Sequence, residues 1–317
     1  MPKSQIIENK EINGIKVDKE NSKVFFNDET HKYYDKNTLK TYISVTTLIS
    51  NYVNKFDAEF WSAYKALEEI MPSDRWCKLR EILLNTKKFQ EHYLDDYQID
   101  KKEFYLKQQE IKDEYARASA EGCEKGTKKH LDKELSFYNR TEYDFSKYGI
   151  SDLKGSFSCK EDYFELDSPR GIYPEYLISV ESPDGILRVA GQIDCLVIDN
   201  NDVYIIDWKT NKEIKKRSYF DKKRKKNVMM KAPLNNLEDS TWNHYQLQLS
   251  LYAYLMEQVK PGCNIKKLQL VHLRDDGSEE IMECKYLKDD VERMLKHYKR
   301  SIKVQAELNK IKPIKIG

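Results

Sequence analysis

The sequence lacks paired cysteines and long apolar runs, and each absence excludes a class of protein. Its 317 residues include six cysteines, none of them in a C-x-x-C pair or in a His/Cys spacing typical of zinc or an iron–sulfur cluster. We therefore expect no iron–sulfur cluster, and we expect reduced thiols in a cytoplasmic protein. No stretch approaches the roughly 18 apolar residues of a membrane span, so no membrane partner is expected.

Other signals are missing as well. The first residues, MPKSQIIENKEING, are polar, and no secretory signal is visible in them. The phosphate-binding motif G-x-x-x-x-G-K-[ST] is absent, so we expect no ATP-driven motor in this chain. The net charge is only +2 although 34% of the residues are charged. Overall charge therefore argues neither for nor against a nucleic-acid partner, and the local distribution has to decide.

Composition and periodicity divide the chain into four segments. Residues 1–22 form a polar tail, and residues 23–56 form a β-rich segment that we expect to pack on the core. The pattern is helical over residues 57–138, and residues 139–317 form the predicted core, with a lysine-rich loop at 212–231. This order of elements predicts an α/β or α+β core with a helical insertion before it.

A β-meander is predicted in the first half of the core. Strands are expected at EYLISVE, ILRVAGQIDCLVI and VYIIDWKT, separated by the turns SPDG and DNND. Because alternate residues of a strand share a face, Asp207 and Lys209 should point the same way as Val203 and Ile205. Apolar residues on both faces indicate a central strand that is covered on two sides.

The second hairpin of this meander brings two acids together. With a four-residue loop at 199–202, Ile198 faces Val203 and Asp194 faces Asp207, which puts their Cβ atoms about 4.5–5.5 Å apart. Two carboxylates so close in apolar surroundings need a shared proton or a cation. A divalent metal with oxygen ligands is the natural solution.

The first hairpin adds a third acid. With a turn at 182–185, Glu175 faces Gln192 and lies diagonal to Asp194, roughly 7–8 Å away. Glu181 lies on the same face of the strand as Glu175, but it is about 26 Å along the strand from the level of Asp194. Glu175 is therefore the better candidate, with Glu181 as the alternative, because a single bulge would shift the register.

Two or three carboxylates and a lysine make a hydrolytic site. A metal would lower the pKa of a bound water and neutralise phosphate charge, and Lys209 would orient the water or stabilise the developing charge. For D-W-K alone, a solvated strand end with one salt bridge is the simpler interpretation. The predicted pairing of Asp194 with Asp207, together with Glu175, favours the metal site.

The sequence GQID, followed twelve residues later by IDWKTNK, resembles the signature of the PD-(D/E)xK nuclease superfamily. It is most similar to the RecB-like exonucleases, and among them to phage members and to the mitochondrial genome maintenance exonucleases. Three further segments fit this group: HKYY with YISVTTLI, GTKKH, and YQLQLSLYAY. The literal Pro-Asp of the signature is replaced by Ile193 and Asp194.

This resemblance implies a restriction-endonuclease-like fold, in which a mixed central sheet is flanked by helices. It also implies one or two Mg²⁺ or Mn²⁺ ions, without ATP or an iron–sulfur cluster. The implied metal ligands are His130, Asp194, Asp207 and the backbone carbonyl of Trp208. Glu175 would bind metal or water, and the implied catalytic residues are Glu175, Asp194, Asp207 and Lys209. Without the resemblance, His130 is more simply a surface or structural histidine.

Nucleic-acid contacts are predicted on a helix and on the basic loop. The segment from Lys212 to Lys231 holds ten basic residues and two acidic ones, which suits a phosphate backbone, although a solvated mobile loop explains it about as well. A glutamine and a tyrosine one turn apart on a helix are ordinary interfacial residues until the resemblance is considered. The candidates are Thr210, Lys222, Lys223, Arg224, Gln248 and Tyr252.

We therefore predict a metal-dependent deoxyribonuclease, more narrowly an exonuclease that acts on single-stranded DNA or free ends in replication, recombination or repair. The resemblance to phage members implies a phage-encoded enzyme of the host cytoplasm. An endonuclease on the same core is one alternative, and a catalytically silent nucleic-acid-binding accessory protein is another. The intact Asp207-x-Lys209 argues against the silent protein. The sequence does not identify any protein partner.

Overall fold

The computed structural model describes residues 10–138, 143–151, 153, 157–159, 166, 169–221 and 224–310. The chain forms two compact units. The first unit comprises Met1–Val53, Lys128–Phe220 and Asn227–Gly317, and the second comprises Asn54–Thr127 and Asp221–Lys226. Every residue that builds the candidate site described below lies in the first unit.

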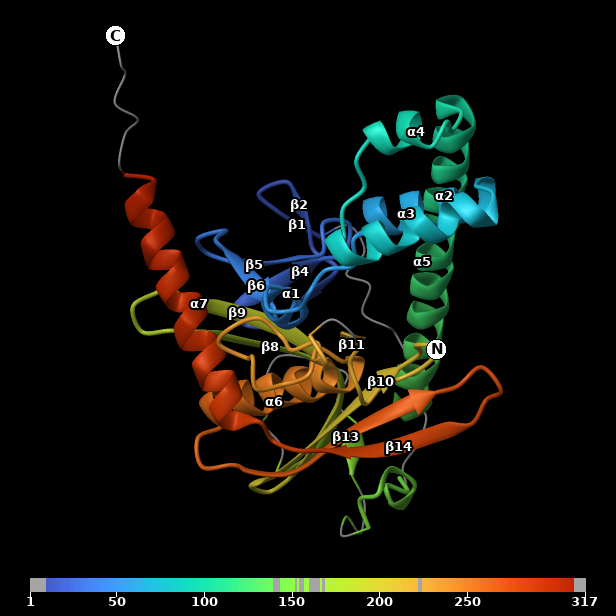
Figure 1. Cartoon of the computed structure of the whole chain (residues 1–317). Coiled ribbons are helices and arrows are strands. Elements are labelled where there is room, and N and C mark those ends of the chain that lie inside the picture. The colour runs from blue at the N-terminus through green and yellow to red at the C-terminus, as the bar shows by residue number, and fades with distance from the viewer. Residues whose placement is uncertain are drawn as a thin grey trace. The chain divides into compact units, whose positions relative to one another are not determined.

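A ten-stranded mixed sheet forms the centre of the first unit (Figure 1). Its main path runs β14-β13-β10-β9-β6-β5-β4-β3, and β8 pairs with β9 and with the short β7. The strands are β3 (Lys19–Glu20), β4 (Val24–Asn27), β5 (Lys32–Asp35), β6 (Thr41–Ser44), β7 (Ser158–Cys159), β8 (Arg170–Glu181), β9 (Arg188–Asp199), β10 (Asp202–Lys209), β13 (Asn264–Leu273) and β14 (Glu279–Cys284).

Two small two-stranded sheets lie outside this main sheet. The first is formed by β1 (Glu11–Ile12) and β2 (Ile15–Lys16), and the second by β11 (Phe220–Asp221) and β12 (Lys226–Asn227). The second of these small sheets falls within the predicted basic loop.

The central strand β9 changes its neighbour on one side halfway along. On one side, β8 pairs antiparallel with β9 along its whole length. On the other side, β10 pairs antiparallel with the C-terminal half of β9 up to Cys195, and β6 pairs parallel with it near Val189. Asp194 therefore lies in the stretch of β9 between these two pairings.

The register of the second hairpin is the one that the alternation predicts. Val203 pairs with Ile198, and the ladder continues to Ile206 opposite Cys195. The connection is tighter than the predicted four-residue loop, because Asp199 and Asp202 already pair. The shorter turn leaves the register unchanged, because one residue on each side of the predicted loop joins the ladder instead.

The register of the first hairpin differs by two residues from the prediction. Glu181 pairs with Arg188, and Gln192 pairs with Leu177 rather than with Glu175. The reason is a longer connection, which runs from 182 to 187 instead of closing at 182–185. As a consequence, Glu175 moves up to the level of Asp194.

Helices cover one face of the sheet with a large apolar core. α6 (Thr241–Val259) connects β10 to the parallel strand β13, and α7 (Lys288–Leu308) packs against α6 (Figure 1). The short α1 (Val45–Ser50) follows β6 and packs on the same side. Val203 and Ile205 of β10 contribute to this core.

The other face of β10 carries a second, more aromatic core. Tyr204, Ile206 and Trp208 pack there with Phe137 at the C-terminal end of α5 (Lys101–Tyr138). A 3₁₀ turn at Ser146–Tyr148 also covers this face. The two-sided burial predicted for the strand is confirmed, and it explains why both faces of β10 are apolar up to Asp207.

The second unit is helical. It contains α2 (Ala58–Ile70), α3 (Ser73–Thr86), α4 (His92–Asp96) and the first part of α5, which pack around Leu67, Leu79, Leu83, Leu94 and Phe104. α5 runs without interruption through Gly122 and Gly126. Within the described part of the chain, no helix is both long enough and apolar enough to cross a membrane.

Candidate metal centre and active site

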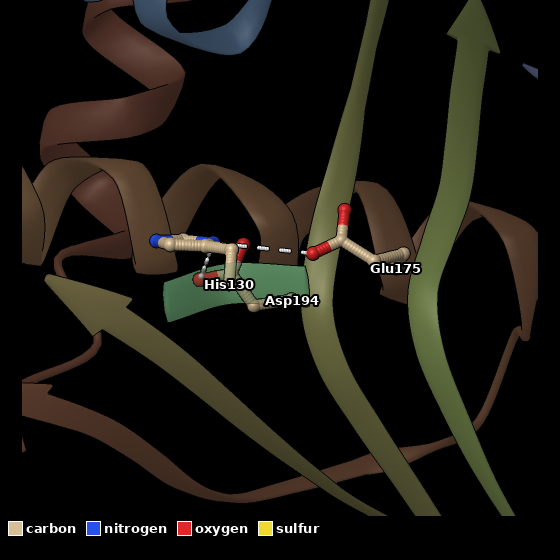
Figure 2. A group of neighbouring side chains, drawn as sticks. All are labelled: His130, Glu175 and Asp194. Carbon is tan, nitrogen blue, oxygen red and sulfur yellow. Dashed lines mark ion pairs between the residues drawn. The ribbon is translucent and has the colours of Figure 1, made fainter. Parts of the chain in front are cut away.

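Three donor side chains meet in the first unit. His130 of α5, Glu175 of β8 and Asp194 of β9 each offer a ligand atom, and these atoms all lie within 4.8 Å of one another (Figure 2). His130 Nδ1 is 3.5 Å from Asp194 Oδ2 and 3.9 Å from Glu175 Oε1. One helix and two adjacent strands thus bring together residues that are far apart in the sequence.

Glu175 reaches this position through an irregularity in β8. Its neighbours Pro174 and Tyr176 pair with Cys195 and Ile193, so Glu175 is level with Asp194 across the ladder. The backbone of Glu175 is left-handed, with φ of 51°, a conformation that costs a non-glycine residue roughly 1–2 kcal/mol. Such strain is typical of functional positions, and here it accompanies an acid that joins the donor cluster.

Asp194 is held by the main chain of the next strand. Its Oδ2 accepts a hydrogen bond of 2.7 Å from the backbone N–H of Trp208. Asp207 occupies the ladder position that follows Ile206, so the two acids are neighbours across β9 and β10, as predicted. Asp194 is 7% exposed and Asp207 is 1% exposed. Burial and the charge of Asp207 together raise the pKa of Asp194 to about 7.

Lys209 and Gln248 engage both oxygens of Asp207. Lys209 Nζ is 2.5 Å from Asp207 Oδ2, and Gln248 Nε2 donates to Oδ1 at 3.1 Å. Burial would lower the pKa of Lys209, but the charges of Asp207 and Asp194 raise it above its usual range. Lys209 is therefore a cation at neutral pH. Asp207 stands beside the cluster of three donors rather than within it.

His130 is also a cation in the metal-free protein. Burial would lower the pKa of its imidazole, but the interaction with Glu175 and the charge of Asp194 raise it to about 9. In the same way, burial would raise the pKa of Glu175, but Lys19 and His130 hold it below its usual range. The centre thus consists of buried carboxylates whose charge is balanced by nearby cations.

Tyr252 packs against a glycine of the GQID sequence. A Cβ on Gly191 would lie 2.8 Å from Tyr252 Cε1 and 3.0 Å from Val45 Cγ2. The charges of Asp207 and Asp194 add to burial in raising the pKa of the buried Tyr252 hydroxyl. The predicted Gln248 and Tyr252 are therefore both beside the acids, and the glycine permits the close approach of the tyrosine ring.

Sequence reasoning missed the residues that surround Lys209. The ring of Tyr245 lies 5.1 Å from Lys209 Nζ, and its hydroxyl donates to Asn211 Oδ1. The carbonyl of Asn211 lies 2.6 Å from Nε2 of His272, which pairs with Lys209 across β10 and β13. Tyr245 precedes Gln248 by nearly one helical turn, and this spacing is the signal that could have placed it at the site.

Lys19 is a further residue that sequence reasoning missed. It lies in β3, far from the signature in sequence, and its Nζ is 3.5 Å from Glu175 Oε2. Nothing in the sequence around Lys19 indicates this contact, because the fold brings β3 close to β8 although the two strands do not pair with each other.

The remaining predicted residues occupy different places. Trp208 donates its N–H to Asp194, and a metal contact of its carbonyl stays a prediction. Thr210 is half-buried directly after β10. Arg224 is exposed and belongs to the second unit. Lys222 and Lys223 lie outside the described residues.

The donor set fits a divalent cation. One imidazole nitrogen and carboxylate oxygens are ligands that Mn²⁺ and Mg²⁺ accept. Asp194 and Glu175 are buried, and a shared cation relieves the repulsion between such groups. His130, Glu175 and Asp194 are therefore the residues that would hold a metal, with Asp207 adjacent to them.

Comparison with known proteins gives a family and a structural likeness. The sequence profile described as PD-(D/E)XK nuclease superfamily matches residues 90–313. No curated protein matches the chain. Among solved structures, the crystal structure of SSO0001 is similar to it at 16% sequence identity, over 72% of this chain and 87% of that chain, with a TM-score of 0.31.

Proposed function

The chain belongs to the PD-(D/E)XK nuclease superfamily, and on this premise we propose that it is a Mg²⁺- or Mn²⁺-dependent DNA exonuclease. The observation that carries the proposal is the convergence of His130, Glu175 and Asp194 beside the ion pair of Asp207 and Lys209. A superfamily member with this set of side chains has the groups that phosphodiester hydrolysis requires.

In this proposal, different side chains bind the metal and stabilise the charge of the reacting phosphate. His130, Glu175 and Asp194 would hold the divalent cation, with Asp207 next to them. When bound, such a cation acidifies water and neutralises phosphate charge. Lys209 is protonated because two carboxylates stabilise its charge. It would therefore stabilise the negative charge that develops on the phosphate rather than remove a proton from water.

Neighbouring residues would keep the charged groups in place. Gln248 donates to one oxygen of Asp207 and leaves the other to Lys209. Tyr252 lies against Gly191 at the same edge of the site. We propose that these two residues also face the substrate, and that Thr210 and the basic loop contribute contacts to the DNA backbone.

The finer parts of the proposal come from the sequence resemblance. A preference for single strands or free ends, a role in replication, recombination or repair, and action in a phage-infected cytoplasm follow from the likeness to RecB-like and phage exonucleases. The buried carboxylates and the basic loop support a nucleic-acid substrate, and they are compatible with each of these finer statements.

Digestion of labelled DNA tests the proposal. The purified protein is incubated with end-labelled linear single-stranded DNA, linear double-stranded DNA and circular single-stranded DNA, with Mg²⁺, with Mn²⁺ and with a chelator. An exonuclease degrades the linear substrates only with metal and leaves the circle intact. Cleavage of the circle would instead show an endonuclease. Binding without cleavage under every metal condition would indicate a catalytically silent protein and overturn the proposal.

A further inference from the structure

The N-terminal segment contributes a cation to the acidic centre. Lys19 of β3 places its Nζ 3.5 Å from Glu175 Oε2, on the carboxylate whose other oxygen faces His130. We propose that Lys19 is a built-in counter-ion, which stabilises the metal-free centre and weakens its affinity for a divalent cation. This inference rests on the metal-binding part of the proposed function.

Two neighbouring contacts help to fix Lys19 in this position. Asn21, two residues on, donates through Nδ2 to the carbonyl of Leu177 in β8 at 3.1 Å, and this bond is buried. Lys23, two residues further, pairs with Glu181 at 3.1 Å. The segment from Lys19 to Lys23 is therefore bound along β8, and the ammonium of Lys19 is directed at Glu175 by more than its own ion pair.

The side chain of Asn21 also shapes the segment itself. Its Oδ1 accepts hydrogen bonds from the backbone N–H groups of Lys23 and Val24. The turn between β3 and β4 is therefore rigid, and the Lys19 side chain, which is 29% exposed, starts from a defined backbone. A lysine on such a support loses less conformational freedom when it pairs than a lysine on a loose tail.

Charge explains why this lysine would affect a metal. In the metal-free protein, the carboxylates of Glu175, Asp194 and Asp207 are close to the cations Lys19, His130 and Lys209. A divalent cation at the three donors would be attracted by the carboxylates and repelled by the ammonium groups. Lys209 is needed for the reaction, whereas the charge of Lys19 opposes the metal.

Lys19 engages only one of the two oxygens of Glu175. Its contact is with Oε2, and Oε1 is the atom that faces His130. The geometry therefore allows Lys19 and a metal to engage the same carboxylate at once. The effect on metal affinity comes from repulsion between two cations rather than from competition for one atom.

Replacement of Lys19 separates its effect on metal affinity from its effect on the stability of the metal-free protein. Binding of Mn²⁺ alone, without DNA, is measured by calorimetry, and thermal unfolding is followed with and without Mn²⁺ in the full chain. We expect Lys19→Gln to lower the dissociation constant for Mn²⁺ on the order of fivefold, a modest change because the lysine is partly exposed. We also expect its metal-free Tm to fall by about 1–3 °C. Lys19→Arg keeps the charge and should bind Mn²⁺ as the unmodified protein does.

Lys23→Gln is the matched control. It removes an ion pair from the same segment to the same strand, but its partner Glu181 is six residues from Glu175. A purely structural role of the segment would make the two glutamine variants alike, with a similar loss of Tm in the presence and absence of Mn²⁺. We expect Lys23→Gln to leave the Mn²⁺ affinity unchanged. Lys19→Met retains the aliphatic stem and replaces Lys19→Gln if that variant does not fold.

The outcomes distinguish this inference from the proposed function. If the unmodified protein binds Mn²⁺ and Lys19→Gln binds it equally or more weakly, the counter-ion role is wrong while the metal site stands. If neither protein binds Mn²⁺ or Mg²⁺, both the inference and the proposed metal-dependent activity are overturned. Tighter binding by Lys19→Gln, restored to the original value by Lys19→Arg, supports the inference.

Discussion

Asp194 of β9 is tied to β10 by a hydrogen bond of 2.7 Å between its Oδ2 and the backbone N–H of Trp208. An asparagine could still accept this bond, whereas an alanine would leave a buried N–H without a partner. We predict that Asp194→Asn folds with little loss of stability but loses metal binding and at least 100-fold in activity. Asp194→Ala should in addition lose about 1–3 kcal/mol of unfolding free energy. Urea denaturation and Mn²⁺ calorimetry measure the two effects, and full activity of Asp194→Asn would contradict the assignment.

Metal binding should depend strongly on pH. In the metal-free protein the pKa of His130 is raised to about 9 and that of Asp194 to about 7, and a metal must displace protons from its ligands. We therefore expect Mn²⁺ affinity to rise from pH 6 to pH 9, with release of about one to two protons near neutral pH. Calorimetry in buffers of different ionisation enthalpy counts the protons. Binding that is independent of pH would argue that His130 is not a ligand.

The same two groups predict the pH dependence of stability. Both folded-state pKa values are raised above the unfolded ones. The contribution of His130 is complete below its unfolded pKa, near 6.5, and is lost as the pH rises through 9. The contribution of Asp194 to stability is likewise lost as the pH rises from about 4 to 7. The rise in Tm on addition of Mn²⁺ should therefore be larger at pH 8.5 than at pH 6. A His130→Gln variant should lose most of this difference.

Gln248 should be required for activity beyond its effect on stability. It donates to Oδ1 of the buried Asp207 at 3.1 Å, so Gln248→Leu leaves that oxygen without a donor. We expect a loss of about 1–3 kcal/mol of unfolding free energy and of roughly 10–100-fold in activity. Gln246→Leu is the control, because Gln246 is buried on the same helix but bonds to Lys285 and Asn243. Equal activity losses in the two variants would indicate a general packing effect.

Tyr245 should act on the rate through Lys209. Its ring lies 5.1 Å from the ammonium, a contact worth about 0.5–2 kcal/mol. We expect Tyr245→Leu to lower kcat about tenfold, with little change in Mn²⁺ affinity, because the tyrosine does not touch the three donors. Tyr245→Phe keeps the ring and loses only the bond to Asn211, so its loss should be smaller. If both variants have the same kcat as the unmodified protein, the ring does not position the lysine.

Gly191 tests the close packing beside the site. Gly191→Ala would bring a methyl group 2.8 Å from Tyr252 Cε1, which we expect to cost about 1–3 kcal/mol of unfolding free energy. Gly122→Ala serves as a control, because a methyl group there meets nothing within 4 Å and the residue lies within α5. That variant should be more stable by about 0.5–1 kcal/mol. Chemical denaturation of the two variants should therefore show changes of opposite sign.

Local patterns were sufficient to predict the acids on β9 and β10. The two-residue period fixes which side chains of a strand share a face, and the symmetric shortening of the turn after Asp199 did not alter the pairing of Ile198 with Val203. The same logic chose Glu175 over Glu181 but gave it the wrong ladder partner, because the connection between β8 and β9 is two residues longer than the turn motif indicated. Hairpin register depends on loop length, and the apolar Ile186 and Leu187 at the end of this connection resemble the start of the next strand although they lie outside it.

Long-range contacts were beyond the reach of sequence reasoning. Lys19 contacts Glu175 because the segment from Lys19 to Lys23 is bound along β8. His272 reaches Asn211 because β13 runs parallel to β10. Neither relationship leaves a periodic trace in the sequence. The family resemblance supplied Gln248 and Tyr252 as site residues, but it did not show that Gln248 binds Asp207 directly or that Gly191 is needed beside Tyr252.

The change of pairing partner along β9, from β10 to β6, matters for the design of fragments of this protein. The family profile begins at residue 90, yet β6, at Thr41–Ser44, completes the edge of β9 beyond the end of β10. A fragment trimmed to the profile would lack β6 and expose the backbone of β9 at Val189 and Ala190, and such an open edge favours self-association. The smallest autonomous folding module must therefore retain the early strands, although they contain none of the signature residues.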